Sequence, residues 1–264
     1  LIANFICSGF DNVFAVFIPP VITIDGKQES NTKCGFDSVN CGSLELAISR
    51  YKRPGTLFQL NDNIEYRVVS TIQISSDDIQ IRSRSGDNGG ARILCTISPC
   101  IIASSRYVIF TGLSIMGSSS RLSVRSAIDS TLVVSPSTYA RLDHITVFNS
   151  SASNGAAIYA APLAKLQIIS SIFHHNYADG EGGAIFFSLG CRSAISDSLF
   201  LANQAVGAGG AISLRQTTLA ITGSRLVRNK ARGNGGAISL ISASTLTAYN
   251  LSATNNYSGR NGAV

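Results

Sequence analysis

A four-residue phrase, Gly-Gly-Ala-Ile, constrains the fold of this chain more than any other feature. It begins at Gly182, Gly209 and Gly235. A related Gly-Ala-Ala-Ile begins at Gly155, and Asn-Gly-Ala-Val begins at Asn261. The intervals between these five starting points are 27, 27, 26 and 26 residues. A phrase that returns at so steady a period predicts a repeat protein, in which each unit packs only on its neighbours.

A second motif, Phe-x-x-Asn, precedes the phrase. Its two clearest copies are Phe173–Asn176 and Phe200–Asn203, and in each the Asn stands six residues before the first glycine. In the last copy, Asn256 can take the place of Asn255. Counting back six residues from every starting point gives Asn149, Asn176, Asn203, Asn229 and Asn255.

Stacked coils explain why these residue types recur. A coil holds three short strands, and the next coil lies one strand spacing, ~4.8 Å, above it. Equivalent Asn side chains then form a ladder, in which each amide donates to one neighbouring coil and accepts from the other. Paired glycines suit a corner with positive φ or close backbone approach. We expect corners at Gly182, Gly183, Gly209, Gly210, Gly235 and Gly236. We expect a buried stack of Phe173, Phe200, Leu226, Ile158, Ile185, Ile212 and Ile238.

The predicted fold is all-β: a single-stranded right-handed parallel β-helix (solenoid) with one short N-terminal capping helix. Right-handedness follows because parallel crossover connections are almost always right-handed. A leucine-rich repeat needs its own Leu/Asn consensus, and an α-solenoid needs long helical segments. The sequence has neither.

The pattern divides the chain into four segments. Residues 1–20 are apolar apart from Asp11 and lack a basic region and a cleavage site, so we interpret them as a partial or processed leader. Residues 21–56 form an N-terminal cap, in which a polar, loop-like stretch over 27–42 carries Cys34 and Cys41. A helix near 43–52 follows behind a Ser N-cap. Irregular coils follow over 57–145. Regular coils occupy 146–264, and we expect them to continue beyond the chain end.

Composition and cysteine usage favour an extracellular protein. Only 14% of the residues are charged, against about 25% in ordinary domains. The close pairs Cys34/Cys41 and Cys95/Cys100 lack the C-x-x-C spacing of zinc and redox sites. We therefore predict local disulfides and an oxidising compartment, with buried free thiols as the alternative. No pairing is assigned to Cys7 and Cys191.

The net charge of +6 comes from 21 basic and 15 acidic residues. The basic residues are scattered, without a Lys/Arg run or interleaved aromatics, so nucleic acid is not an expected partner. A weakly basic surface that meets acidic glycans or an acidic partner is one interpretation, and a charge without functional meaning is the other.

Gly-Gly-Ala-Ile paired with Phe-x-x-Asn resembles the repeat of the polymorphic outer membrane proteins of chlamydiae. Similar repeats occur in large extracellular proteins of several microbial eukaryotes. The resemblance is specific over about residues 146–264 and rests on a weaker pattern over 21–145. It implies a right-handed parallel β-helix, exposure at a surface, and adhesion as in the chlamydial members.

The sequence offers no catalytic constellation, so we expect no enzyme activity, no cofactor and no metal. Right-handed β-helices also include pectate lyases, polygalacturonases and pectin esterases, and hydrolases among them need paired carboxylates. The adjacent Asp77-Asp78 is interpreted as a solvated turn. His174-His175, near Asp179 and Glu181, fills variable positions of the repeat and is interpreted as an incidental surface pair.

The predicted function is that of a non-enzymatic extracellular or cell-surface β-helix, acting as an adhesin or as the structural rod of a surface assembly. The alternative is a polysaccharide-acting lyase or hydrolase of the pectate-lyase-like class. Expected partners are other surface proteins, glycans or copies of the chain, without nucleic acid and without a direct membrane span. Among three Asn-x-Ser/Thr sequons, Asn250 and Asn256 are glycosylation candidates, whereas Asn149 falls in the expected ladder.

Overall fold

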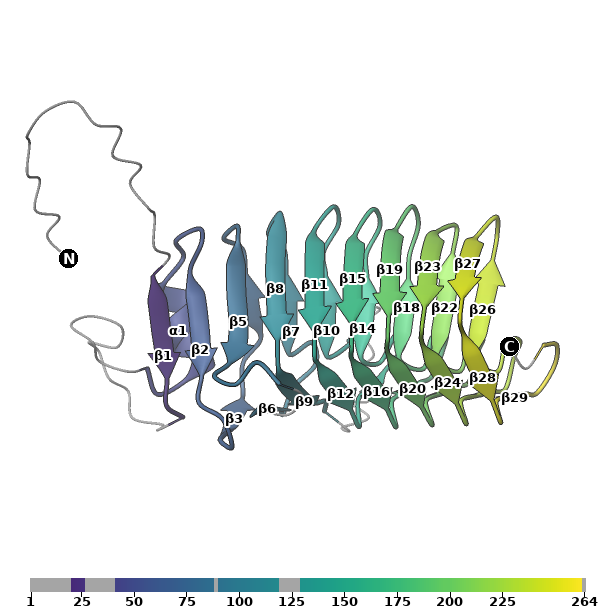
Figure 1. Cartoon of the computed structure of the whole chain (residues 1–264), viewed down its shortest axis with the longest axis horizontal. Helices are drawn as coiled ribbons and strands as arrows, with labels where there is room; N and C mark the ends of the chain where they lie inside the picture. The colour runs from purple at the N-terminus through teal and green to yellow at the C-terminus, as the bar shows by residue number, and fades with distance from the viewer. Residues whose placement is uncertain (1–19, 27–40, 88–89, 119–128, 263–264) are drawn as a thin grey trace, which may run out of the picture.

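The computed structural model describes residues 20–26, 41–87, 90–118 and 129–262. Its strands wind into an elongated stack of coils that runs from the N-terminal to the C-terminal end (Figure 1). Neighbouring strands pair in parallel, and the described strands form four sheets. The fold is the predicted all-β, right-handed parallel solenoid of about seven turns. Apart from Pro20, the predicted leader lies outside the described residues.

The four sheets share the coils between them. Sheet A contains β1 (Val21–Ile24), β2 (Leu57–Leu60), β5 (Ile79–Ser83), β8 (Tyr107–Thr111), β11 (Tyr139–Asp143), β15 (Lys165–Ile169), β19 (Arg192–Ser196), β23 (Thr218–Thr222) and β27 (Thr245–Tyr249). Sheet B contains β3 (Glu65–Val68), β6 (Ala91–Cys95), β9 (Leu113–Met116), β12 (Thr146–Phe148), β16 (Ile172–His174), β20 (Leu199–Leu201), β24 (Arg225–Val227) and β28 (Ser252–Thr254). Sheet C contains β4 (Ile72–Ile74), β7 (Ile101–Ala103), β10 (Leu132–Val134), β14 (Ile158–Ala160), β18 (Ile185–Phe187), β22 (Ile212–Arg215) and β26 (Ile238–Ile241). Sheet D contains β13 (Ser151–Ala152), β17 (Tyr177–Ala178), β21 (Gln204–Ala205), β25 (Lys230–Ala231) and β29 (Tyr257–Ser258).

A regular coil passes through sheets C, A, B and D in that order, as β14, β15, β16 and β17 do. Residues with left-handed backbone separate the strands: Ser170, with φ of 46°, lies between sheets A and B, and His175, with φ of 54°, lies between B and D. The sequence predicted three strands per coil. The regular coils have a fourth, because a two-residue strand follows the ladder position.

The solenoid interior consists of apolar columns. Along the regular strands, inward apolar residues alternate with exposed ones, as the burial pattern of β23 shows. The rings of Phe173 and Phe200 stack with centroids 5.0 Å apart. Burying one such side chain stabilises the fold by about 1.5–3 kcal/mol. The residues expected in the stack are at most 2% exposed: Phe173, Phe200, Leu226, Ile158, Ile185, Ile212 and Ile238.

A buried ladder of Asn side chains occupies the turn between sheets B and D. Nδ2 of Asn176, Asn203 and Asn229 each donates to Oδ1 of the Asn one coil further on, at 3.0 Å, and the last acceptor is Asn256. Nδ2 also donates to a carbonyl of the preceding coil, as from Asn203 to Phe173 O at 2.9 Å. Each Oδ1 accepts a backbone N–H as well, as from Asn176 N to Asn203 at 3.1 Å. The hydrogen bonds of these buried amides are thereby satisfied, as burial requires.

Two of the five predicted ladder residues were assigned wrongly. Asn149 and Asn255 occupy the left-handed position one residue earlier, with φ of 52° and 56°. Ser150 and Asn256 occupy the ladder positions instead. The backbone N–H of Ser150 donates to Asn176 Oδ1, and Asn256 Oδ1 accepts from Asn229 Nδ2. In the last coil, the six-residue count back to the ladder started from Asn261. The first-glycine position of that coil is Gly262, as its φ of 68° shows, so the count ended one residue too early. In the first regular coil, the loop before the glycine is one residue shorter than in later coils.

A second ladder, made of serines, was not predicted. Ser198 Oγ accepts from Ser171 N, and Ser224 Oγ accepts from Ser198 N, both at 3.1 Å. Each hydroxyl donates to the carbonyl two residues earlier, at 2.7–2.9 Å. Ser171, Ser198 and Ser224 stand 27 and 26 residues apart, which matches the period of the glycine phrase. An alignment of the repeats would therefore have shown a recurring serine at this position.

The glycine phrase forms the corner between sheets D and C. Gly182, Gly209 and Gly235 have φ of 66°, 69° and 66°, values that residues with a Cβ rarely adopt. A Cβ on Gly183 or Gly210 would collide with the carbonyl oxygen of the same phrase in the next coil. The first glycine is therefore required by its backbone conformation and the second by close stacking.

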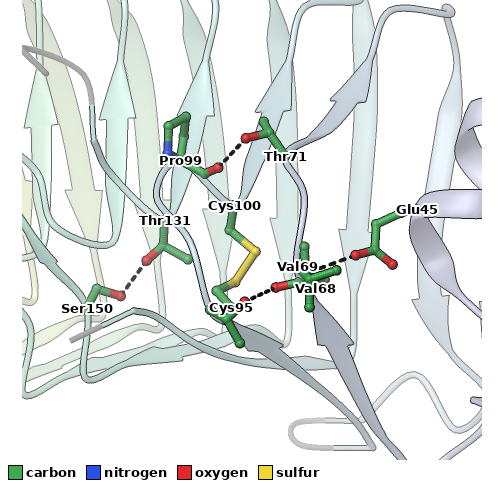
Figure 2. The surroundings of a disulfide bond; sticks show 10 residues. Glu45, Val68, Val69, Thr71, Cys95, Pro99, Cys100, Thr131 and Ser150 are labelled. Atoms are coloured by element: carbon green, nitrogen blue, oxygen red, sulfur yellow. Dashed lines mark hydrogen bonds between the residues drawn. A yellow bond between two sulfur atoms is a disulfide. The ribbon is translucent and has the colours of Figure 1, made fainter. Parts of the chain in front are cut away.

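Helix α1 (Leu44–Arg50) lies at the N-terminal end of the stack (Figure 1), where it packs against β4, β1 and β3. It begins at the predicted N-cap, where Ser43 Oγ accepts from Leu46 N at 3.1 Å. Its apolar face is buried against the first coils. Glu45 Oε1 accepts from Val69 N at 2.9 Å, which ties the helix to the coil that contains β3 and β4 (Figure 2).

The predicted disulfide between Cys95 and Cys100 is present, with Cα atoms 5.6 Å apart (Figure 2). It joins the end of β6 to the residue before β7, at the corner where later coils carry the glycine phrase. Cys191, which had no predicted partner, is a buried free thiol that donates to Ala161 O at 3.2 Å.

The prediction for Cys41 needs a correction. The sequence placed it in a polar loop, but Cys41 is 0% exposed and belongs to the hydrophobic core. Its backbone continues the pairing of sheet A, because Cys41 N donates to Thr23 O at 2.9 Å and Asp25 N donates to Cys41 O at 3.0 Å. These bonds form a parallel bridge between Cys41 and Ile24. The loop assignment was wrong because a single paired residue leaves no alternating pattern in a polar stretch.

The proposed partner of Cys41 is not confirmed. Cys41 is disulfide-bonded, so the alternative of a free thiol is wrong for this residue. Cys95 and Cys100 pair with each other and Cys191 is free, so the partner of Cys41 lies outside the described residues. Cys34 and Cys7 both lie there, and the predicted Cys34/Cys41 pair therefore stays a prediction.

Asn203→Leu is expected to lower the free energy of unfolding by roughly 3 kcal/mol, because Asn176 N, Asn176 Nδ2 and Phe173 O lose their buried partners. The urea midpoint, followed by far-UV circular dichroism, measures the loss. Gln204→Leu is the matched control, since this neighbouring side chain points outward from β21 and should change stability by about 0.5 kcal/mol or less. Equal midpoints for the two variants would contradict a stabilising ladder.

Candidate functional site

The outer face of sheet A carries a group of polar and aromatic side chains, named here the outer polar cluster. Register places Tyr139 beside Tyr107, and Arg141 beside Gln167. Alternate residues of a strand face the same side, so these side chains project together from the solenoid. The cluster comes from β8, β11, β15 and the residue after β11: Tyr107, Tyr139, Arg141, Asp143, His144 and Gln167.

Direct contacts hold the cluster together. The rings of Tyr107 and Tyr139 lie with centroids 5.0 Å apart. Tyr139 Oη donates to Gln167 Oε1 at 2.8 Å, and Arg141 Nη1 donates to the same oxygen at 3.1 Å. Burial, together with the neighbouring Tyr107, raises the pKa of Tyr139 although Arg141 opposes the shift. The Tyr139 hydroxyl therefore stays protonated and acts as a donor at neutral pH.

Asp143 is the one carboxylate of the cluster. Its Oδ2 accepts from Arg141 Nη2 at 2.7 Å, and its Oδ1 lies 2.7 Å from His144 Nδ1. Burial raises the pKa of Asp143, but the hydrogen bonds and charges of Arg141 and His144 together outweigh it and hold the pKa below its ordinary value. The carboxylate is therefore ionised at neutral pH, and its side chain is 20% exposed.

The outer polar cluster differs from the site of a typical glycoside hydrolase. Glycoside hydrolysis uses two carboxyl groups, and one of them must carry a proton. The cluster has one carboxylate, and that one is ionised. Within the described residues, no group of His, Cys, Asp or Glu is arranged to hold a metal ion. An aromatic pair beside fixed donors and acceptors can instead contact a bound molecule.

The adjacent Asp77-Asp78 has a structural role. Asp77 accepts from Arg106 N at 2.7 Å and from Arg106 Nε at 2.8 Å, which links two coils. The backbone hydrogen bond, followed by that of the guanidinium, lowers the pKa of Asp77. Asp78 forms the turn before β5, with φ of 57°.

The other carboxylates considered from the sequence also have partners. Glu181 Oε1 accepts from Arg215 Nη2 at 2.7 Å, and Oε2 accepts from Ser213 Oγ at 3.1 Å. Asp179 Oδ1 accepts from Tyr177 Oη at 3.2 Å. The contacts of Glu181 connect the loop before β18 to β22 of the next coil, whereas the contact of Asp179 stays within its own coil.

His174 and His175 contact each other on the outer side of sheet B. Their Nδ1 atoms are 3.0 Å apart, and the His174 ring stacks on Phe148 with centroids 5.0 Å apart. Burial, with a smaller effect of the neighbouring His175, lowers the pKa of His174. A neutral imidazole stacked on an aromatic ring behaves as part of an apolar outer column.

A cleft of about 670 Å³ lies beside α1 and has Glu45 and Glu65 in its lining. Glu45 accepts from Val69 N, and Glu65 lies 3.8 Å from Arg92 in an exposed ion pair. Glu45 therefore holds the cap to the first coils, and Glu65 contacts the neighbouring coil.

The structure changes the choice of glycosylation candidates. Asn256 lies in the ladder, where Nδ2 donates to Leu226 O at 2.9 Å and Oδ1 accepts from Asn229. Because a glycan would attach to this engaged nitrogen, the placement argues against Asn256. Asn250 and Asn149 are exposed. Asn250 stays a prediction, and the argument that excluded Asn149 does not hold.

The outer polar cluster has no signal in the sequence repeat. Tyr107 and Tyr139 are 32 residues apart, whereas the register partners Tyr139 and Lys165 are 26 apart. No fixed period aligns these positions, and only the strand register brings them together.

The stacked coils define the class of the protein as a parallel β-helix. Within this class, the chain carries a polymorphic-membrane-protein-like repeat. The family described as "Chlamydia polymorphic membrane protein (Chlamydia_PMP) repeat" matches residues 170–188, which include Phe173, Asn176 and the phrase that begins at Gly182. A search of curated proteins finds no match. No helix among the described residues is long and apolar enough to cross a membrane.

Two solved structures share the general shape at low identity. The pectin methylesterase from Aspergillus niger in deglycosylated form is 9% identical with a TM-score of 0.49, and the match covers 89% of this chain and 86% of that one. A pectin methylesterase in complex with hexasaccharide VII is 12% identical with a TM-score of 0.40, and the match covers 78% of this chain and 65% of that one. Neither similarity carries an argument about function at these values.

His174→Leu, which copies Leu201 of the next coil, is expected to reduce the loss of stability on acidification. Because the folded pKa of His174 lies below its ordinary 6.5, the unfolded chain binds the proton more readily, and wild-type stability falls as the pH drops through that range. Urea midpoints at about pH 7.5 and about pH 5 measure the difference. An identical acid-induced loss in wild type and variant would show that His174 does not contribute.

Cys191 is expected to resist alkylation in the folded protein. Burial raises the pKa of its thiol to about 11, and the side chain is 1% exposed, so neither thiolate nor access is available. Iodoacetamide treatment followed by peptide mapping should label Cys191 only after unfolding in urea. Rapid labelling of the folded protein would contradict this placement.

Proposed function

We propose that this chain is a non-enzymatic β-helix of the cell surface or the extracellular space, acting as an adhesin or as the structural rod of a surface assembly. The supporting observation is that residues which recur from coil to coil point inward or form the corners, whereas residues which vary between coils point outward. One outward column of sheet B runs Phe148, His174, Leu201 and Val227 with unbroken strand pairing. A rigid scaffold that carries variable side chains suits binding.

The repeat and the disulfide support the location. A repeat that resembles the Chlamydia polymorphic membrane protein repeat is consistent with a surface protein. The Cys95–Cys100 disulfide is consistent with an oxidising compartment. The partners we propose are other surface proteins, glycans or further copies of the chain, and the exposed Asn250 remains a proposed glycosylation site.

The alternative is a polysaccharide-acting enzyme, and the outer polar cluster is where its chemistry would have to lie. The single ionised carboxylate of Asp143 speaks against glycoside hydrolysis, because that reaction uses two carboxyl groups, one of them protonated. Binding of a sugar or of a protein side chain needs no such group.

Incubation with methyl-esterified pectin and with polygalacturonate should release no methanol, reducing ends or unsaturated products above the buffer level. A pectin methylesterase run in parallel is the positive control. Product formation that is abolished by Asp143→Asn or Asp77→Asn would overturn the non-enzymatic assignment.

The adhesion and rod roles are tested by attachment. Fluorescently labelled protein should bind to intact cells or lengthen into filaments visible by negative-stain microscopy. The heat-unfolded protein is the control, since its outward columns are lost. A folded protein that neither attaches to cells nor self-associates would refute both roles.

A further inference from the structure

The net charge of this protein is concentrated in one part of the chain. All 15 acidic residues lie between residues 1 and 197, together with 15 of the 21 basic residues, so this part carries no net charge. Residues 198–264 contain six basic residues and no acidic one. The entire net charge of +6 therefore belongs to the last coils.

Four of these six cations form one row on the outer surface, named here the basic ridge: Arg225, Arg228, Lys230 and Arg232. They belong to a single coil, on β24, the following turn, β25 and the residue after it. All four are exposed, while the residues between them that point inward, such as Leu226 and Asn229, are buried. Seven residue steps span at most about 25 Å, so the ridge is a line of charge across sheets B and D.

No carboxylate in the described part of the chain neutralises the basic ridge. Among the described residues, the ion pairs of arginine involve Arg92, Arg106, Arg141 and Arg215, and none includes a ridge residue. The coils on either side place uncharged residues in register: Leu199 and Ser252 beside Arg225, and Gln204 and Tyr257 beside Lys230.

One carboxylate, Asp197, lies one coil away beside Gly223, two residues before Arg225, and none of the ion pairs found among the described residues joins it to the ridge. Asp179 is two coils from Arg232 in the stack, ~10 Å at one strand spacing per coil. Glu181 already accepts from Arg215 and Ser213. Lys230 Nζ lies over the Tyr257 ring, 5.4 Å from its centroid, a contact that leaves the positive charge in place. Four cations with one carboxylate near the Arg225 end leave the ridge a net cationic surface.

We propose that the basic ridge binds an anionic polysaccharide whose sulfate or carboxylate groups follow the row of cations. A linear array on an open surface matches a chain of charges better than a single small anion. Nucleic acid fits less well, because single strands are held by stacking on successive aromatic side chains, and Tyr257 is the one ring among the register neighbours Leu199, Ser252, Gln204 and Tyr257. The Cys95–Cys100 disulfide is also consistent with an oxidising, extracellular compartment, which favours an extracellular ligand.

This inference rests on the proposed binding role and names its ligand class. The test compares the full chain with the variant Arg225→Gln/Arg228→Gln/Lys230→Gln/Arg232→Gln on immobilised heparin and on immobilised polygalacturonate. Wild type should be retained on at least one column and released by NaCl. The variant should elute at much lower salt, and the slope of log K against log [NaCl] should fall in magnitude by about 3, since up to four contacts are lost.

The matched control removes four exposed cations elsewhere, as Arg67→Gln/Arg82→Gln/Arg84→Gln/Lys165→Gln, and so has the same net charge. It should elute close to wild type, and urea midpoints should show that both variants remain folded. Preference for heparin would identify sulfate as the recognised group, and preference for polygalacturonate would identify the carboxylate.

Three results would overturn the inference: no retention of wild type, equal weakening in both variants, or tighter binding to DNA of matched charge than to either polysaccharide. If the ridge variant still attaches to cells, the proposed adhesive function is distinguished from the proposed ligand of the basic ridge. In that case the adhesive role stands and its assignment to this ridge does not.

Discussion

The Asn ladder is the interaction on which the arrangement of the coils depends. The amide of Asn203 bonds to Phe173 O in the coil before it and to Asn229 in the coil after it, so one side chain joins three coils. A coil shifted by one residue would replace the ladder Asn with a left-handed position such as Ala202 and leave buried amide groups without partners. Since an unpaired buried amide costs about 1–3 kcal/mol, the register is strongly specified. The stacked phenylalanines then need only to fill the interior that this register defines.

Because interior residues determine the conformation and register of each coil, the outward side chains can vary between coils. The ladder sets the corner between sheets B and D, the glycine phrase sets the corner between D and C, and neither uses an outward side chain. Neighbouring coils can therefore carry His174, Leu201 and Val227 at one outward position without disturbing the strand pairing. The outer polar cluster on sheet A and the basic ridge on sheets B and D are two such outward regions. They lie on different faces, so the same rod can present both.

The sequence predicted the architecture well because the architecture is periodic. Glycines at a steady interval, the buried Phe and Ile positions, the Ser43 N-cap and the Cys95–Cys100 pair all follow from local chemistry repeated at a fixed spacing. Asn149 and Asn255 were misplaced where the interval changes by one residue, since a count along the chain cannot see which residue adopts positive φ. The outer polar cluster was missed because Tyr107 and Tyr139 come from coils of unequal length. Surface function depends on residues that differ between coils, and periodicity carries no information about them.

The basic ridge illustrates how a solenoid creates a site that is invisible along the chain. Its cations stand three, two and two residues apart and look scattered in the sequence. In the coil they become neighbours on one surface, because the intervening Leu226, Asn229 and Ala231 turn inward. Outward residues on a strand are roughly 7 Å apart, within the screening length of about 8 Å at physiological ionic strength, whereas Asp179 at ~10 Å lies beyond it. The cations therefore act on a ligand together, and the single carboxylate of Asp197 near the Arg225 end leaves them a net positive charge.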